Sequence, residues 1–362
     1  MAALGSFRDI FATNPTSEFE EFSLKLSNGA TLTGISYIPA QRGVAGSATR
    51  PLVVGIHGAS CSAYVYDVSP EYTASKYSML SNVPFLAFNR PNYLGSSGRL
   101  VDRSSEASAT PQFEAKEGEA LVQEEARWYH ELIFPALWEE FAVPNHCSSI
   151  VTTSHSMAVP PTIIASGLYS ASRPSEGYVW AGMVLSGFAE VNNNTFLSVS
   201  GNLATNEYTP DQLPYGQDSK IHTPPYLERD KQELMLGPPG LCDNDLRPLI
   251  WKQQTPLLQQ EVFDMFGIWI QEKARYKAAV KIPVLNGLGE FDYIWNGTKE
   301  NADSFCSDFT SCPRLESAVV EGAPHAIELS RAGGGWWMRV FGWAIEVGIG
   351  NAMRSSKPPK YD

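Results

Sequence analysis

The sequence contains the run Ile150-Val151-Thr152-Thr153-Ser154-His155-Ser156-Met157-Ala158, a short apolar stretch that leads into a serine flanked by small residues. A serine on a sharp turn from strand to helix exposes its Oγ, and small residues two positions away on either side avoid collisions of Cβ atoms with backbone. Ser154 and Ala158 meet this need, although glycine is commoner at both positions. Taken alone, the pattern also fits a serine in an ordinary strand-to-helix turn.

Two later strands end in the groups that a nucleophilic serine requires. The apolar run 282–285 leads into a Gly-rich turn that is followed by Asp292, and the run 315–320 leads into a turn that contains His325. A serine nucleophile needs a base and a carboxylate that orients it, and one known chain order is Ser, then Asp or Glu, then His. We therefore predict Ser156 as nucleophile, His325 as base and Asp292 as the orienting acid.

A third strand end supplies donors for the oxyanion. The apolar run 52–56 ends in His57-Gly58-Ala59-Ser60. A turn of this kind can aim a backbone N–H at the oxyanion, together with the N–H of the residue after the nucleophile. These would be the N–H groups of Ala59 and Met157, while His57 is expected to stabilise the turn.

The wider pattern predicts an α/β fold. Short runs without a polar face indicate strands buried on both sides; they occur at 52–56, 84–88, 150–153, 179–185, 282–285 and 315–320. Residues 19–26 and 31–38 flank Asn28-Gly29 and predict an entry hairpin. Helical periodicity covers 117–141, where Pro135 is expected to kink or end the helix, and 336–347. Strands that alternate with helices imply a mostly parallel, doubly wound sheet.

The interval 191–280 breaks this alternation and predicts an inserted cap, or lid, within a core formed by 1–190 and 281–362. Eight prolines lie close together in it: Pro210, Pro214, Pro224, Pro225, Pro238, Pro239, Pro248 and Pro256. Further on, helical spacing puts apolar residues on one face: Leu258, Val262, Met265, Phe266, Trp269 and Ile270. Glu261, Asp264, Glu272 and Arg275 lie off that face. The apolar face fits either a core-facing helix or a lid above a substrate site.

With these motifs in order, the chain resembles the α/β-hydrolase superfamily over roughly 52–158 and from 282 to the final helix. Residues 88–97 resemble the family's Asp-Arg-Pro-Gly-Tyr-Gly-x-Ser loop, with Asn89 in place of the acid and Leu94 as an extra residue. The resemblance also makes Glu190 an alternative acid, since some members place it at that strand end. More loosely, the chain is similar to fungal hydrolases from polyketide and AK-toxin-type clusters, among them esterases, thioesterases and lactone-forming cyclases.

Composition excludes several classes of protein. The 362 residues carry a net charge of −12 and no run of basic residues, which argues against nucleic acid as a partner. No segment is apolar enough to span a membrane, and Arg8 and Asp9 interrupt the place of a signal peptide, so we expect a cytoplasmic protein. The five cysteines form no CxxC pair, and pairing of Cys306 with Cys312 stays open. Neither metal-ligand spacing nor a nucleotide-binding glycine motif is present, so no cofactor is expected.

The sequence thus predicts a serine hydrolase or acyltransferase that acts on an ester or thioester of a hydrophobic small molecule, free or delivered on a carrier protein. The acyl group would pass to water or to a hydroxyl of the substrate, giving a lactone. Met265, Phe266, Trp269 and Ser60 are candidates for the substrate site. Two alternatives remain at this point: a lyase that uses the same triad, and a ligand-binding receptor without turnover.

Overall fold

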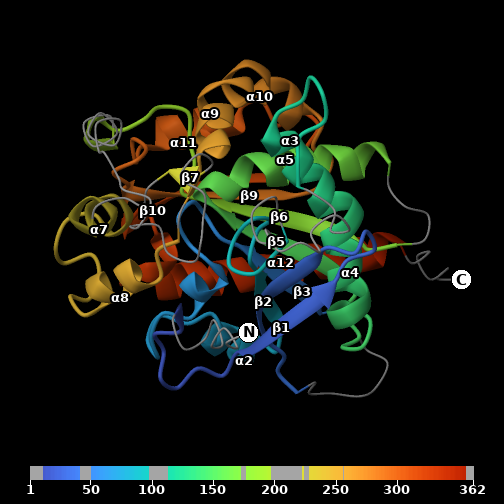
Figure 1. Cartoon of the computed structure of the whole chain (residues 1–362), viewed down its shortest axis with the longest axis horizontal. Coiled ribbons are helices and arrows are strands. Elements are labelled where there is room, and N and C mark those ends of the chain that lie inside the picture. Colours follow the sequence, from blue (N-terminus) through green and yellow to red (C-terminus); the bar gives the residue numbers. More distant parts are fainter. Residues whose placement is uncertain are drawn as a thin grey trace, which may run out of the picture.

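An eight-stranded sheet forms the centre of the molecule (Figure 1). The structure is a computed structural model that describes residues 11–40, 50–97, 113–172, 177–196, 222–223, 228–255 and 257–355. The strands lie in the order β1 (Glu20–Lys25), β2 (Thr31–Tyr37), β4 (Phe85–Phe88), β3 (Pro51–Ile56), β5 (Ser149–His155), β6 (Trp180–Ser186), β9 (Val284–Phe291) and β10 (Leu315–Pro324). The six strands from β4 to β10 pair in parallel, and β1 and β2 form the predicted antiparallel hairpin. The predicted doubly wound α/β fold is confirmed.

Helices cover both faces of the sheet, which explains the absence of a polar face on its inner strands. In β3, Leu52, Val54 and Ile56 pack into one hydrophobic cluster, whereas Val53 packs into another on the opposite face. Helices α2 (Ser75–Ser81) and α12 (Gly333–Ser355) contribute to the second cluster, and α3 (Leu121–Trp128), α5 (Val159–Ala171) and α11 (Lys299–Cys306) contribute to the first. Because successive side chains of a strand point to opposite faces and both faces are covered, the side chains on both faces must be apolar.

The helical segment before β5 continues past Pro135, so the expectation that this residue would end the helix is wrong. After α3 come a π-helical turn (Tyr129–Ile133), α4 (Phe134–Leu137) and a second π-helical turn (Trp138–Ala142). Backbone angles stay right-handed helical at each junction. A proline lacks the N–H donor and crowds the carbonyl four residues back, and a π turn widens the spiral there. The segment thus passes Pro135 with a π turn on either side of it and no break in helical conformation.

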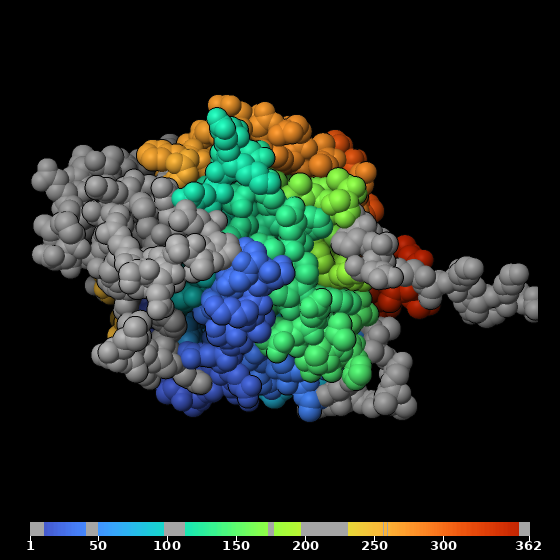
Figure 2. Space-filling model, turned by 45° about the vertical axis from the view of Figure 1, so that its right-hand side comes forward, coloured from blue at the N-terminus to red at the C-terminus, as the bar shows by residue number. Residues whose placement is uncertain are grey.

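Between β6 and β9 the described residues form a mostly helical layer. It contains α7 (Glu228–Leu236), α8 (Leu246–Lys252), α9 (Gln259–Phe266) and α10 (Ile268–Ala278), with a two-residue antiparallel pair, β7 (His222–Thr223) and β8 (Leu257–Leu258). Of the eight prolines predicted to break regular structure, Pro238, Pro239 and Pro248 lie in this layer, and Pro210, Pro214, Pro224, Pro225 and Pro256 lie outside the described residues. Figure 2 shows α9 and α10 beside the start of α3 at one end of the molecule.

The predicted apolar face across 258–270 is wrong in part. The segment is two helices, because the backbone breaks at Gly267, where φ is −103° and ψ is −102°. Phe266 and Ile270 are about half exposed, whereas Glu261 and Asp264, assigned to the polar side, are buried. The two carboxylates are accommodated because polar groups of the core meet them: Asp264 accepts a hydrogen bond of 3.0 Å from the backbone N–H of Val122. Charge alone therefore misassigned the buried face.

The cysteines form no disulfide, and the described helices contain no candidate membrane span. All five cysteines are free thiols, so the pairing of Cys306 with Cys312 that the sequence left open is not formed. The Sγ of Cys312 lies 3.2 Å from the carbonyl oxygen of Ile282 instead. No helix among the described residues combines the length and the apolar character needed to cross a membrane.

Candidate active site

Ser156 lies on a strained turn directly after β5. Its φ is +53°, in the left-handed region that residues with a Cβ rarely adopt, and a short 3-10 turn (Ser156–Ala158) connects it to α5. A Cβ on Gly58 would come within 3.0 Å of the Ser156 Cβ, which is tighter than an ordinary contact, so glycine leaves room for the turn. Pro160 and Pro161 fit in the first turn of α5, where the N–H groups have no partner within the helix.

The structure brings Ser156, His325 and Asp292 into one hydrogen-bonded line. His325 follows β10 and Asp292 follows β9, so all three residues lie at the carboxyl ends of parallel strands. His325 Nε2 is 3.0 Å from Ser156 Oγ, and His325 Nδ1 is 2.8 Å from Asp292 Oδ2. The second carboxylate oxygen, Asp292 Oδ1, accepts hydrogen bonds from the backbone N–H groups of Ile294 (2.8 Å) and Trp295 (2.9 Å). A carboxylate fixed in this way sets the orientation of the imidazole.

Glu190, the alternative acid, is engaged elsewhere. Its carboxylate pairs with Lys273 and, at 2.7 Å, with Lys277. Its backbone N–H donates to the side chain of Asn301. Because two ammonium groups hold this carboxylate and Asp292 contacts His325 directly, the geometry favours Asp292 as the acid.

The two residues predicted to supply oxyanion donors belong to the cavity of Ser156. Ala59 and Met157 line the same cavity as Ser156. Ser60, which follows Ala59, has a φ of +52°, and its carbonyl oxygen accepts hydrogen bonds from Lys231 and from the backbone N–H of Thr255 at 3.1 Å. The loop that carries the Ala59 N–H is thus fixed by residues of the layer between β6 and β9.

The cavity above Ser156 has a largely apolar wall. From α9 it is lined by Val262, Met265 and Phe266, so two of the three lid residues predicted to meet substrate are there. Trp269 is not among the lining residues; its ring packs instead against Phe188 and stacks on Tyr276. Ser60 is also absent from the described wall and is buried.

His155 contacts the site in a way that the sequence did not predict. Its ring centroid is 4.7 Å from that of His325, and its Nδ1 is 3.0 Å from Ser186 Oγ. Ser186 in turn donates to the buried carboxylate of Glu328 at 2.7 Å. Burial, assisted by the neighbouring His325, holds the pKa of His155 well below its usual value. His155 is therefore a neutral ring packed against His325, where it restricts the position of the base.

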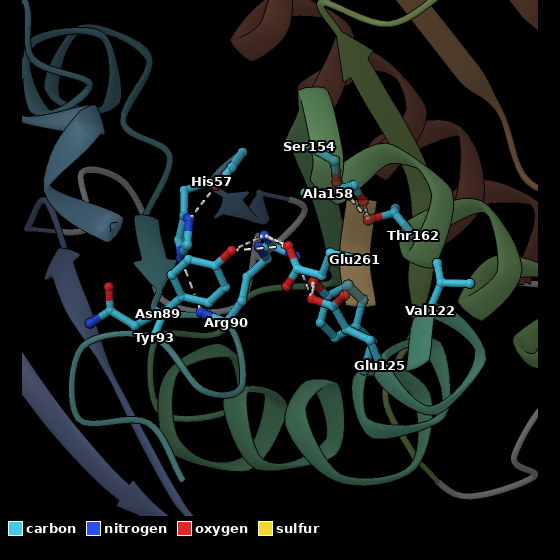
Figure 3. Close-up of polar contacts among 12 residues, drawn as sticks. His57, Asn89, Arg90, Tyr93, Val122, Glu125, Ser154, Ala158, Thr162 and Glu261 are labelled. Atoms are coloured by element: carbon cyan, nitrogen blue, oxygen red, sulfur yellow. Dashed lines mark hydrogen bonds and ion pairs between the residues drawn. The ribbon is translucent and has the colours of Figure 1, made fainter. Parts of the chain in front are cut away.

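A buried ionic cluster connects the layer above the site to the core (Figure 3). Arg90, fully buried, pairs with Glu125 of α3 and with Glu261 of α9, each at 2.9 Å. The Tyr93 hydroxyl also donates to Glu261 at 2.9 Å. Burial raises the pKa of Glu261 to about 7; the Arg90 guanidinium opposes this shift and the Glu125 carboxylate adds to it. The cluster fixes α9, and with it one wall of the cavity.

The loop 88–97 also orders the strand end that carries the oxyanion turn. Arg90 donates its backbone N–H to His57 Nε2 at 3.1 Å, while His57 Nδ1 is 2.8 Å from the carbonyl oxygen of Gly58. Burial, with the positive charge of Arg90, holds the pKa of His57 well below its usual value, so this neutral ring stabilises the turn. Asn89 accepts from the Ala63 N–H and donates to Thr33 Oγ1, and an ionised aspartate, which only accepts, could not donate the second bond.

The fold and the position of the site at the carboxyl ends of its parallel strands define the class of protein: the chain has the α/β-hydrolase fold. Among solved structures it is similar to a soluble variant of monoglyceride lipase from Saccharomyces cerevisiae, with 14% identity, a TM-score of 0.56, and coverage of 93% of this chain and 97% of that chain. It is also similar to E-2-(acetamidomethylene)succinate hydrolase (13% identity, TM-score 0.53, 91% and 100% covered) and to a thermophilic esterase (14%, 0.50, 91% and 99%).

No protein-family model matches the chain, and no curated protein is similar to it in sequence. At the identities of these solved structures the likeness is one of fold, so the activity has to be argued from the site itself. Within the part of the chain that the structure describes, no group of three or more His, Cys, Asp and Glu side chains could hold a metal ion.

Proposed function

We propose that this protein is a serine hydrolase that cleaves a carboxylic ester of a hydrophobic small molecule. The observation that carries the proposal is the hydrogen-bonded line from Ser156 through His325 to Asp292, together with the apolar cavity that Ser156 lines. A nucleophile, a base and an orienting acid in this geometry are what acyl transfer requires.

The reaction then has two halves. Ser156 Oγ attacks the ester carbonyl carbon and gives its proton to His325 Nε2, while Asp292 stabilises the imidazolium. The N–H groups of Ala59 and Met157 stabilise the oxyanion, and each such donor contributes about 10²- to 10³-fold to rate in hydrolases of known mechanism. His325 returns the proton to the leaving alcohol. Water then attacks the acyl-serine, its proton passes to His325, and the acid leaves as Ser156 regains its hydrogen.

The substrate class extends to thioesters of polyketide type, free or on a carrier protein, on the strength of the resemblance noted in the sequence. We assign residues 191–280 as the lid over the site, because Val262, Met265 and Phe266 of α9 line the cavity. A lid that excludes water favours attack on the acyl-serine by a hydroxyl of the substrate, which would release a lactone.

The first experiment measures hydrolysis of p-nitrophenyl esters from C2 to C12, with labelling of Ser156 by a fluorophosphonate as a direct test of the nucleophile. Ser156→Ala and His325→Ala should each lower kcat by at least about 10³-fold. Ser154→Ala is the matched control, because Ser154 lies two residues away with its Oγ bonded to Thr162 at 2.8 Å, and it should keep most of the activity. Full activity of His325→Ala would refute the assignment.

Mass spectrometry of the products from medium-chain hydroxyacyl thioesters separates the remaining outcomes. A free acid indicates hydrolysis, and a product lighter by one water indicates lactone formation. Turnover of a substrate without any acyl adduct on Ser156 would instead indicate a lyase. Tight binding of ligand without turnover of any ester would indicate a receptor.

A further inference from the structure

Lys231, on α7, is a buried ammonium group in the wall of the active-site cavity. Lys231 is 1% exposed to solvent and lines the same cavity as Ser156. Its Nζ donates to the carbonyl oxygen of Ser60 and lies 3.9 Å from Cys61 Sγ. No carboxylate of the described residues pairs with it, and burial lowers its pKa.

The other buried cations show what such a group normally requires. Arg90 has the carboxylates of Glu125 and Glu261 at 2.9 Å, and Lys277 has those of Glu190 at 2.7 Å and Asp308 at 2.9 Å. A charge taken out of water is stable only when an opposite charge and hydrogen bonds compensate for it. Among the described residues Lys231 has one carbonyl and one thiol as partners, so within this part of the chain two of its three N–H donors have no strong acceptor.

The surroundings of Lys231 indicate where the missing charge would come from. Leu257, Val262, Met265 and Phe266 line the cavity and offer no anion. The cavity is also where the proposed reaction takes place, so a group that enters with the substrate comes to the wall that Lys231 helps to form.

We propose that Lys231 binds a carboxylate of the substrate, so that the preferred substrates are apolar esters or thioesters that carry a second, free carboxylic acid. This inference rests on the proposed hydrolase function. It makes the half-ester of a dicarboxylic acid a better substrate than a neutral ester of equal length.

A purely structural role for Lys231 makes a different prediction. Residues of the layer between β6 and β9 hold the loop after β3 by three hydrogen bonds. Lys231 Nζ and the Thr255 N–H both donate to the Ser60 carbonyl oxygen, and Thr255 Oγ1 donates to the Cys61 carbonyl oxygen at 2.8 Å. If Lys231 acted only on the loop, its loss would slow all esters equally. If it binds a carboxylate, its loss acts selectively on acidic esters.

The test compares kcat/KM for mono-p-nitrophenyl adipate and p-nitrophenyl hexanoate, which have acyl chains of six carbons and differ in the terminal carboxylate. The wild-type protein should prefer the adipate, and Lys231→Met should lower the adipate-to-hexanoate ratio about 10- to 100-fold, as expected for a hydrogen bond to a charged group. Thr255→Val is the matched control: it removes a bond to the loop without a change of charge and should leave the ratio intact.

A binding measurement separates failure of this inference from failure of the proposed function. Ser156→Ala protein should bind monomethyl adipate more tightly than methyl hexanoate by calorimetry, and the added Lys231→Met change should abolish the difference. Equal affinity for the two esters, or an equal loss of kcat/KM for both substrates in Lys231→Met, would overturn the role of Lys231. If no ester is hydrolysed but the difference in binding remains, the anion site stands and the hydrolase proposal fails.

Discussion

Gly187 lies where the two histidine rings of the site meet, and its replacement by alanine should displace the His325 ring while all three residues of the triad keep their identity. It follows β6 with a φ of +61°. A Cβ there would come within 2.7 Å of His155 Cε1 and 3.1 Å of His325 Cε1. Ordinary contact begins near 3.4 Å, so the His155 ring must move by about 0.7 Å and the His325 ring by about 0.3 Å.

The size of the effect follows from these displacements. A misplacement of about 1 Å in a catalytic site costs about 10²-fold in rate, so a shift of about 0.3 Å in the His325 ring should lower kcat about 3- to 10-fold. The left-handed backbone adds about 1 kcal/mol of strain, and the overpacking adds about 1–3 kcal/mol, both as loss of unfolding free energy. The assays are kcat on a p-nitrophenyl ester and unfolding in urea.

Gly118→Ala provides the matched control for this prediction. Gly118 has a φ of +79° and no atom within 4 Å of an added Cβ, so the substitution should show the backbone strain alone, with wild-type kcat. In the Gly187→Ala protein, a further His155→Ala change should restore part of the lost rate by making room for the new methyl group. Wild-type kcat in Gly187→Ala would refute the idea that the packed rings fix the base.

Three other substitutions test the packing and the buried charges. Arg90→Met leaves the carboxylates of Glu125 and Glu261 buried without their partner and should cost about 3–5 kcal/mol in urea unfolding; a loss below 1 kcal/mol would contradict the ionic cluster. The pKa of Glu261 is raised to about 7, so its contribution to stability is full below pH 4.5 and disappears as the pH rises through 7. Relative to Glu261→Gln, the unfolding free energy of the wild-type protein should therefore fall by up to about 3 kcal/mol from pH 4.5 to 8. A difference between the two proteins that stays constant over this range would refute this. Gly287→Ala places a Cβ 2.2 Å from the Trp336 ring and should lower Tm at an overpacking cost of about 1–3 kcal/mol, whereas an unchanged Tm would show that the ring moves freely.

The sheet could be predicted from the sequence because its signals are local. Asn28-Gly29 marks the hairpin, and runs without a polar face mark strands that are covered on both sides. Ser156, Asp292 and His325 could be proposed together because each follows a strand, and the carboxyl ends of parallel strands share one edge of a sheet.

The buried charges could not be predicted, because their partners lie far away in the chain. Glu261 is 171 residues from Arg90, and Lys231 is 171 residues from Ser60. Within their own helices these residues have the spacing and polarity of an exposed surface, and a pattern along one helix contains no information about a distant partner. The break at Gly267 was missed for a related reason, since an isolated glycine is tolerated inside many helices.

The Arg90 cluster has a consequence for recombination between proteins of the α/β-hydrolase fold. Grafting the corresponding segment of another protein with this fold in place of α9 would remove Glu261 and leave a buried guanidinium with the single carboxylate of Glu125. A chimera of this kind must carry a matching acid in the incoming segment, or exchange Arg90 and Glu125 along with it. Which segments can be exchanged between such proteins therefore depends on the ion pairs that connect a segment to the rest of the protein, as well as on where its helices and strands begin and end.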